Sequence, residues 1–175
     1  MEHTMTRAAS STAYTHKVMP SPVGALTLVA TGQGLAAVLW EHERVGRVQV
    51  GLEHEDVRHP VLLEAERQLG EYFAGRRTTF ALTLDPQGTA FQQAVWAALR
   101  TIPFGETRSY AEIARQIGRP TAVRAVGAAN GRNPLSIVTP CHRVIGTNGR
   151  LTGFAGGLHT KAFLLRHEGR ANTQG

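Results

Sequence analysis

Residues 133–146 read NPLSIVTPCHRVIG, a segment that joins turn formers, a short apolar run and the only cysteine of the chain. Asn130–Pro134 form a run rich in turn formers, and Ile137–Val138 after it predict a short strand. Pro140 fixes its own φ and has no N–H to donate, so we expect a rigid elbow where the strand ends. Cys141 follows this proline, and its thiol should therefore be held at a defined angle.

The chemistry of Cys141 has two interpretations. A nucleophilic cysteine needs a base or a nearby cation, because a thiol with a pKa of about 8.5 is mostly protonated at neutral pH. His142 and Arg143 are its neighbours, and Glu168, the only acidic residue downstream, is a candidate to orient the imidazole. A lone cysteine after an apolar run is equally typical of a small buried hydrophobic residue.

A single cysteine excludes an intramolecular disulfide and a zinc site built from several thiolates. The eight histidines form no convincing ligand cluster, so we expect neither a metal nor another cofactor. The N-terminal residues lack the apolar core of a signal peptide, and no run approaches eighteen apolar residues. These features predict a cytoplasmic protein without a membrane span.

The 175 residues carry a formal net charge of +6, distributed unevenly. Residues 1–85 have eight Lys and Arg against ten acidic residues, a net of −2, whereas residues 86–175 have eleven against three, a net of +8. No acidic residue lies between Glu112 and Glu168. This basic span predicts a polyanionic partner. Biased genomic composition would explain the excess of Arg over Lys, but it does not explain the missing acids.

The first half of the chain predicts an α/β domain over residues 14–85. Leu26–Ala30 and Leu35–Leu39 have the composition of strands, joined by a glycine-containing hairpin loop. Pro60 begins a helix with apolar residues at helical spacing that Gly75 stops, and Phe80–Leu84 predict a further short strand. The turn at 85–88 marks a domain boundary, and residues 1–13 and 169–175 are expected to be flexible tails.

The second half, residues 86–168, predicts a mostly helical domain. A helix is expected from Thr89, as N-cap, to Arg100, and Ser109 with Glu112 has the form of a capping box that opens a short helix ending at Gly118. Another helix, starting at Pro120 or Thr121, is built of small residues. Two short helices around a glycine-containing turn indicate a helix-turn-helix. Close packing inside a core is the alternative use for such small residues.

Longer strings of sequence resemble one known family. Asn133–Pro134 together with PCHRVIG at 140–146 resembles the active-site signature of O6-alkylguanine-DNA alkyltransferases. The similarity extends over nearly all of the chain after about Val18, with the family-like blocks SPVG at 21–24, YFAG at 72–75, GTAFQ at 88–92, IPFGET at 102–107, GFAGG at 153–157 and KAFLLRHE at 161–168. The resemblance implies an RNase-H-like α/β N-terminal domain, with a small antiparallel sheet plus a helix, before a helical domain with a helix-turn-helix.

The resemblance also implies roles for individual residues. Cys141 would take the alkyl group, with His142 deprotonating it through a water, Glu168 orienting His142 and Tyr110 assisting the departing guanine. The residues that the family implies for DNA binding are Arg124 as an intercalating finger, Asn133 as a hinge, and Tyr110, Ala122 and Ala125. The residues that it implies for the substrate pocket are Asn130, Ser136, Phe154, Ala155 and Gly156. Packing between helices is the alternative role for Tyr110.

The implied activity is DNA repair by direct reversal, in which each molecule removes one alkyl group from O6-alkylguanine, with O4-alkylthymine as a second candidate substrate. The implied partner is double-stranded DNA. The protein is expected to be a monomer in solution, and cooperative binding along DNA is left open. An alkyltransferase-like DNA-damage binding protein is the main alternative, and Cys141 argues against it because such proteins replace the nucleophile. A cysteine hydrolase is the second alternative.

Overall fold

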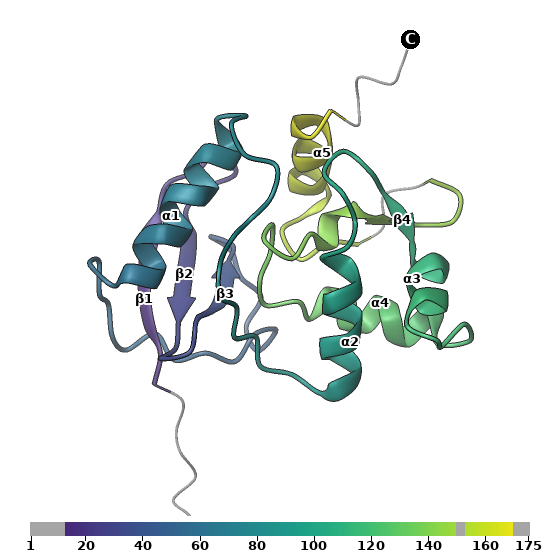
Figure 1. Cartoon of the computed structure of the whole chain (residues 1–175), viewed down its shortest axis with the longest axis horizontal. Helices are drawn as coiled ribbons and strands as arrows, with labels where there is room; N and C mark the ends of the chain where they lie inside the picture. The colour runs from purple at the N-terminus through teal and green to yellow at the C-terminus, as the bar shows by residue number, and fades with distance from the viewer. Residues whose placement is uncertain (1–12, 150–152, 170–175) are drawn as a thin grey trace, which may run out of the picture.

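A computed structural model describes residues 13–149 and 153–169. The N-terminal part is an antiparallel sheet in the order β1 (Thr15–Met19), β2 (Leu26–Ala30), β3 (Leu35–Leu39), and α1 (Pro60–Phe73) packs on one face of it (Figure 1). The strands and helix expected at 26–30, 35–39 and 60–73 are confirmed. β1 was not predicted, because Thr15–Met19 mixes polar and apolar residues and is only partly buried.

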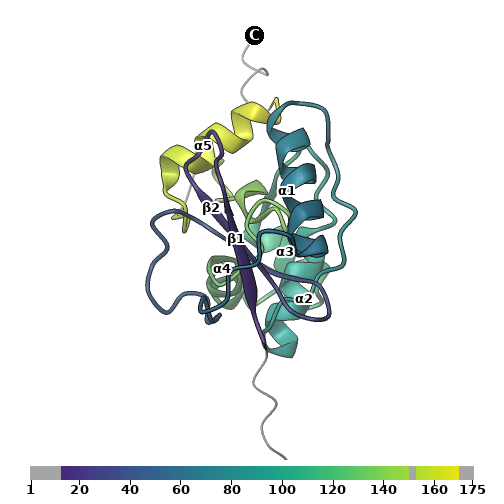
Figure 2. The same cartoon turned by 90° about the vertical axis from the view of Figure 1, so that its left-hand side faces the viewer.

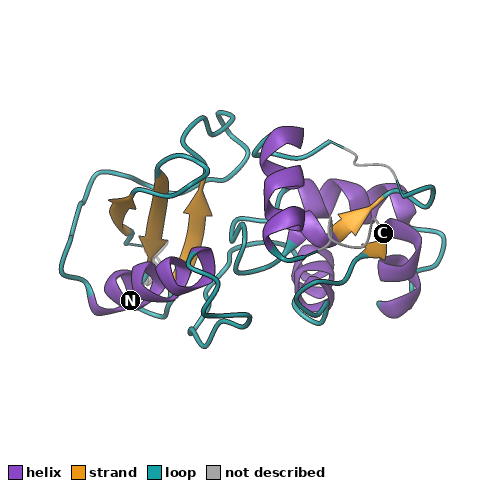
Figure 3. Cartoon of the chain, turned by 90° about the horizontal axis from the view of Figure 1, so that it is seen from above, coloured by secondary structure: helices purple, strands orange, loops and turns teal. Residues whose placement is uncertain are grey.

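The C-terminal part is mostly helical, as Figure 3 shows. Its elements are α2 (Ala90–Leu99), β4 (Arg108–Ser109), α3 (Tyr110–Gln116), α4 (Val123–Gly131), the one-turn 3-10 helix η1 (Cys141–Arg143), β5 (Val144–Ile145) and α5 (Leu158–His167). The short strands β4 and β5 pair in parallel. Within the described ranges, no helix is both long and apolar enough to cross a bilayer.

Local capping chemistry explains where two of these helices begin. Thr89 and Gln92 form a reciprocal capping box at α2, and Ser109 and Glu112 form another at α3, so each pair satisfies backbone donors that the first turn leaves unpaired. The predicted N-caps are therefore confirmed. Gly118, with φ of +76°, lies just beyond α3, where a left-handed residue is needed and glycine adopts it without strain.

The predicted start and end of α4 were wrong by a few residues. The helix begins at Val123, because Pro120–Ala122 form a separate turn in which the Ala122 N–H donates to the Arg119 carbonyl at 2.9 Å. At its other end, Asn130 and Gly131 belong to the helix and not to the following turn. α3 and α4 pack against each other in the helix-turn-helix arrangement, and the Trp96 indole N–H of α2 donates to the Ala129 carbonyl of α4 at 2.9 Å.

The strand predicted at Phe80–Leu84 is wrong, because the outer edge of β3 is divided between two segments. Leu35 at one end pairs with Leu84 through hydrogen bonds to Thr83 and from Asp85, and Val38 at the other end pairs with Leu135. Each partner therefore contributes a single bridge. The strand predicted at Ile137–Val138 is wrong for the same reason, since the pairing falls on Leu135 and the chain turns directly after it.

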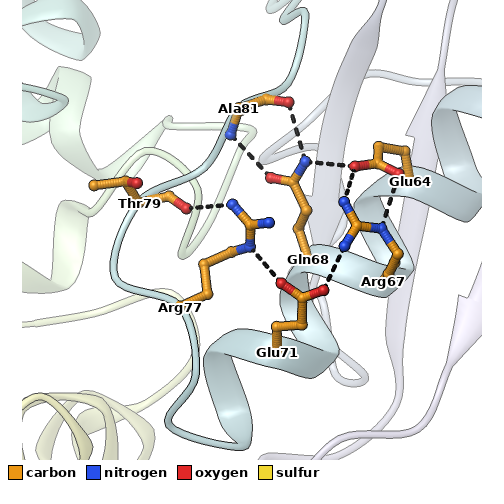
Figure 4. Close-up of polar contacts among 7 residues, drawn as sticks. All are labelled: Glu64, Arg67, Gln68, Glu71, Arg77, Thr79 and Ala81. Atoms are coloured by element: carbon orange, nitrogen blue, oxygen red, sulfur yellow. Dashed lines mark hydrogen bonds and ion pairs between the residues drawn. The ribbon is translucent and has the colours of Figure 1, made fainter.

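A glutamine side chain holds the extended segment in place of a strand ladder. Gln68 of α1, 2% exposed, donates to the Ala81 carbonyl at 3.0 Å and accepts from the Ala81 N–H at 2.9 Å (Figure 4). It also donates to Glu64 at 2.8 Å, which in turn pairs with Arg67 on the exposed side of the helix. The amide thus pairs with Ala81 as a neighbouring backbone would.

We expect Gln68→Ala to destabilise the fold by about 2 kcal/mol, because the Ala81 backbone groups and Glu64 lose buried partners. Thermal unfolding would show a Tm lower by about 6 °C for a chain of this size. Arg67→Ala is the matched control, since its ion pairs are exposed and should contribute little. Equal Tm values for the Gln68→Ala variant and the wild type would contradict this role.

The largest hydrophobic core joins the two halves of the chain. It contains Leu28 and Val38 of the sheet and Leu69 of α1, but also Leu135 and Leu164 from the second half. A second cluster lies among α2, α3 and α4 and includes Cys141. Figure 2 shows α5 passing beside the end of α1. The segment that leads to the cysteine is therefore packed on one side by the N-terminal sheet.

Candidate active site

Three consecutive residues of the site lie on η1. Cys141, His142 and Arg143 are all buried, at 4%, 0% and 6% exposed. The Arg143 N–H donates to the Pro140 carbonyl at 2.9 Å, which closes the short turn directly after the proline. The predicted elbow is thus a one-turn helix that places cysteine and histidine side by side in the interior.

Glu168, the C-cap residue directly after α5, receives hydrogen bonds from three side chains. Its Oε2 contacts His142 Nε2 at 2.8 Å and accepts from the Tyr72 hydroxyl at 2.6 Å. Arg143 donates from Nε to Oε1 at 2.7 Å and from Nη2 to Oε2 at 3.0 Å. Burial raises the pKa of the Glu168 carboxyl, but hydrogen bonds from His142 and Arg143 outweigh it, so the pKa lies well below its ordinary value. Glu168 is ionised at neutral pH.

The contact with Glu168 fixes the protonation of the His142 ring. An ionised carboxylate only accepts hydrogen bonds, so the proton of neutral His142 is on Nε2. Nδ1 then carries a lone pair, and it is buried without a hydrogen-bond partner among the described residues. Burial lowers the pKa of His142 despite the opposing effect of Glu168, which keeps the ring neutral at neutral pH. His142 is therefore arranged as a base through Nδ1.

Cys141 lies in an apolar cluster that disfavours its charged form. Burial raises the pKa of the Cys141 thiol, while a hydrogen bond with Asn133 and the positive charges of Arg47 and Lys161 act to lower it. Lys161 of α5 is 0% exposed and donates from Nζ to the Val144 carbonyl at 2.6 Å. The site thus favours the protonated thiol of Cys141, although the groups around it would stabilise a thiolate.

The segment before the cysteine is held by Asn133 and Arg47. Asn133 is fully buried, donates to the Thr139 carbonyl at 2.8 Å and accepts from the Leu135 N–H at 3.0 Å. Arg47 donates to the Asn133 carbonyl at 2.8 Å from the loop after β3. Ile137, which lies between Asn133 and Cys141 in the sequence, has a φ of +73°, a strained conformation for a β-branched residue. The chain conformation here is imposed by its surroundings.

The residues expected to face DNA lie on the helix-turn-helix. Arg124 and Ala125 are exposed in the first turn of α4, and Ala122 is half-buried just before it. Tyr110 begins α3, lies beside Gly127 of α4 and packs against the cluster that contains Cys141. Tyr110 therefore contacts both α4 and the hydrophobic cluster that contains Cys141. Asn133 is separate from this surface because it is fully buried.

The residues expected to line a substrate pocket come from two places. Asn130 and Ser136 are buried, and their Oδ1 and Oγ atoms have no hydrogen-bond partner within the described part of the chain. Phe154, Ala155 and Gly156 precede α5, and the Phe154 ring meets Trp40 edge-on at 5.6 Å. A Cβ at Gly156 would lie 2.8 Å from the Trp40 ring, so only glycine fits there.

Four residues with a part in this site escaped the sequence analysis as site residues: Trp40, Arg47, Tyr72 and Lys161. Tyr72 was included in the YFAG block at 72–75, with no role given to its hydroxyl. Lys161 carried a signal, because a chain with seventeen Arg has only two Lys. Trp40 and Arg47 had no local signal, because their contacts lie far along the chain.

Models of one known protein family match nearly the whole chain. Residues 14–86 match the family model of the 6-O-methylguanine DNA methyltransferase ribonuclease-like domain, and residues 90–170 match the model of the DNA binding domain of the same family. The chain belongs to the 6-O-methylguanine DNA methyltransferase family. The expected fold class, a ribonuclease-like α/β domain before a helical one, is confirmed.

Individual members of the methyltransferase family are similar at full length. A methylated-DNA–protein-cysteine methyltransferase of Methanosarcina acetivorans is 48% identical over 155 residues, which cover 88% of this chain and 97% of the relative. The Mycobacterium leprae relative of the same name is 51% identical over 150 residues, covering 86% and 89%. The crystal structure of Mycobacterium tuberculosis OGT in complex with DNA superposes with a TM-score of 0.78 at 47% identity, covering 90% and 92%.

Proposed function

We propose that this protein repairs DNA by moving an alkyl group from O6 of guanine to Cys141. The observation that carries the proposal is the buried arrangement of Cys141, His142 and Glu168, in which His142 Nδ1 is left as the acceptor for the thiol proton. Membership of the methyltransferase family gives the substrate class.

The first step is removal of the thiol proton. Because burial raises the pKa of Cys141, little thiolate forms on its own at neutral pH. We assign the proton to His142 Nδ1, through a bridging water, and Glu168 stabilises the imidazolium that results. Lys161 and Asn133 stabilise the thiolate by charge and hydrogen bonding.

The second step is displacement at the alkyl carbon. A bond forms between Cys141 Sγ and that carbon while the carbon–O6 bond breaks, and the electron pair of that bond stays with guanine. Guanine takes up one proton and the His142 imidazolium releases one, so the net change moves the thiol proton to guanine and returns His142 to its neutral form. We assign Tyr110 to hydrogen bonding with the departing base. The thioether has no easy leaving group, so each molecule acts once.

Access to the base requires that the nucleotide leave the duplex. We place Tyr110, Ala122, Arg124 and Ala125 at the DNA surface, with Asn133 acting as a hinge behind it. The planar Arg124 guanidinium would fill the gap that the extruded base leaves, offsetting part of an unstacking cost of a few kcal/mol. Asn130, Ser136, Phe154, Ala155 and Gly156 are assigned to the pocket that receives the base, where Ala155 offers only its backbone N–H.

We assign different functions to the two parts of the chain. Residues 14–85 support the site, and residues 86–168 bind DNA and carry the cysteine. We propose that the protein acts in the cytoplasm, in association with the bacterial nucleoid.

Intact mass spectrometry tests the proposed reaction. Incubation with a duplex containing one O6-methylguanine should add one methyl group per protein molecule, and peptide mapping should locate it on Cys141. A protein that only binds damage would bind the duplex without gaining mass, and a hydrolase would turn over without an adduct. Either result would remove the alkyltransferase assignment.

Arg124→Ala should slow transfer from duplex DNA by about tenfold to hundredfold, because the extruded base loses its replacement in the stack. Transfer from the free alkylated base should change much less. Single-turnover rates on both substrates measure the difference, with Arg58→Ala, a remote exposed arginine, as the control. Equal losses on both substrates would show that Arg124 acts on the chemical step.

The pH dependence of transfer should follow His142. Its pKa is lowered from the ordinary 6.5 because burial disfavours the imidazolium. Protonation removes the base, so the single-turnover rate on saturating DNA should be level through neutral pH and fall only below pH 6.5. A rate that already declines above pH 6.5 as the solution is acidified would exclude His142 as the base.

A further inference from the structure

The hydroxyl of Tyr72 connects the N-terminal helix to the candidate active site. Tyr72 lies in the last turn of α1, is fully buried and donates to Glu168 Oε2 at 2.6 Å across 96 positions of sequence. The same oxygen contacts His142 Nε2 at 2.8 Å. Tyr72 and His142 thus share one carboxylate oxygen, although they come from different halves of the chain.

The position of this hydroxyl is fixed from several sides. The Tyr72 ring packs against Phe73, Phe80 and Phe104 at centroid distances of 5.2, 5.7 and 6.2 Å. His167 lies 4.9 Å away and contacts the Tyr72 carbonyl through Nε2 at 2.7 Å. The ring and the backbone of Tyr72 both contact His167, the residue before Glu168, so the hydroxyl has little freedom to swing away.

Tyr72 acts on Glu168 as a donor only. Burial, the charge of Glu168 and the hydrogen bond to it all raise the pKa of the hydroxyl, and the more distant Arg143 opposes them only in part. The phenol therefore keeps its proton whenever the protein is folded, so it withdraws negative charge from the oxygen that orients His142. Besides Tyr72, the charged groups that act on this pair are Arg143 and Lys161, and the titratable ring of His167 packs against Tyr72.

We propose that Tyr72 is a positioning residue for alkyl transfer, which acts through Glu168 by fixing the carboxylate and limiting its pull on the His142 proton. This inference rests on the proposed function, because it gives Glu168 and His142 their part in that reaction. It makes the N-terminal domain a contributor to the chemical step, through one hydrogen bond.

Tyr72→Phe tests the inference, because it keeps the ring packing and removes only the donor. We expect the single-turnover rate on saturating methylated duplex to fall about tenfold. The duplex concentration that gives half of the maximal rate should stay unchanged. Without the hydrogen bond from Tyr72, the Glu168 carboxylate keeps more negative charge on Oε2 and should raise the pKa of His142. The acid limb of the rate profile should therefore move to higher pH. Tyr14→Phe, the same change away from Glu168, is the matched control and should behave as wild type.

A fluorinated tyrosine at position 72 provides a second variant that keeps both ring and donor. Its more acidic hydroxyl donates more strongly, so the acid limb should move to lower pH than in the wild type. This variant decides the question if Tyr72→Phe does not fold. Opposite shifts in the two variants, or this downward shift alone when Tyr72→Phe is unfolded, would support the inference.

The inference would be overturned if the acid limb of the rate profile were unchanged in the variants that fold. A rate that falls by a constant factor at every pH would not support the inference, because loss of packing alone produces such a fall. The wild-type arm separates this from a failure of the proposed function. If wild type gains no methyl group, the alkyltransferase assignment fails and this inference with it. If wild type reacts and the limbs coincide, only the role of Tyr72 fails.

Discussion

Cys141→Ala should abolish alkyl transfer while leaving the protein able to bind methylated duplex. The chain has no second cysteine, so the variant has no thiol to receive the group. The substitution replaces a small buried side chain by another that fits the same apolar cluster, so we expect the fold to persist.

Intact mass after incubation with methylated duplex measures the first part, and a binding titration on the same DNA measures the second. Wild type and the variant should bind with similar affinity, but only wild type should gain a methyl group. An adduct on the Cys141→Ala variant would place the acceptor on another residue and refute the assignment.

Glu168→Gln should reduce the transfer rate by at least about a hundredfold and destabilise the fold by about 3–5 kcal/mol, the usual cost of breaking a buried ion pair. The amide leaves one oxygen for donors from Tyr72, His142 and Arg143, and its NH₂ group favours the His142 tautomer with the proton on Nδ1. That tautomer has no lone pair for the thiol proton.

Single-turnover rates and denaturant unfolding measure the two losses, with Glu53→Gln, at an exposed glutamate in the loop before α1, as the matched control. The pKa of Glu168 is lowered in the folded state, so its contribution to stability is complete above the ordinary value of 4.5 and is lost as the pH falls further. The stability difference between variant and wild type should therefore shrink below pH 4.5. A difference that is constant with pH would show that Glu168 is not ionised in the fold.

Local sequence signals were sufficient for most of the helices. Pro60 with the apolar spacing after it predicted α1, Thr89 as N-cap predicted the start of α2, and the Ser109–Glu112 capping box predicted the start of α3, because each of these signals lies within one turn. The adjacency of Cys141 and His142 likewise needed no tertiary information. Glu168 was a candidate to orient the imidazole because it is the only acidic residue downstream, and the family resemblance implied the same role. In the structure it lies 2.8 Å from His142 Nε2.

The errors occurred where distant segments compete or meet. Phe80–Leu84 has strand composition, but the edge of β3 that it would extend is also used by Leu135, and nothing local reveals this. The φ of +73° at Ile137 contradicts the preference of a β-branched residue, so sequence reasoning predicts the opposite. Tyr72 reaches Glu168 across most of the chain, so its hydroxyl had no visible partner in the sequence.

The divided edge of β3 also bears on how the protein behaves among other copies of itself. Sheet edges with unpaired backbone groups are templates on which further chains add, the usual first step of aggregation. Here the chain covers its own edges, with His16–Glu55 on β1 and Leu35–Leu84 and Val38–Leu135 on β3. A repair protein that reacts once persists as spent molecules until it is removed, and these bridges limit the backbone on which spent molecules could assemble.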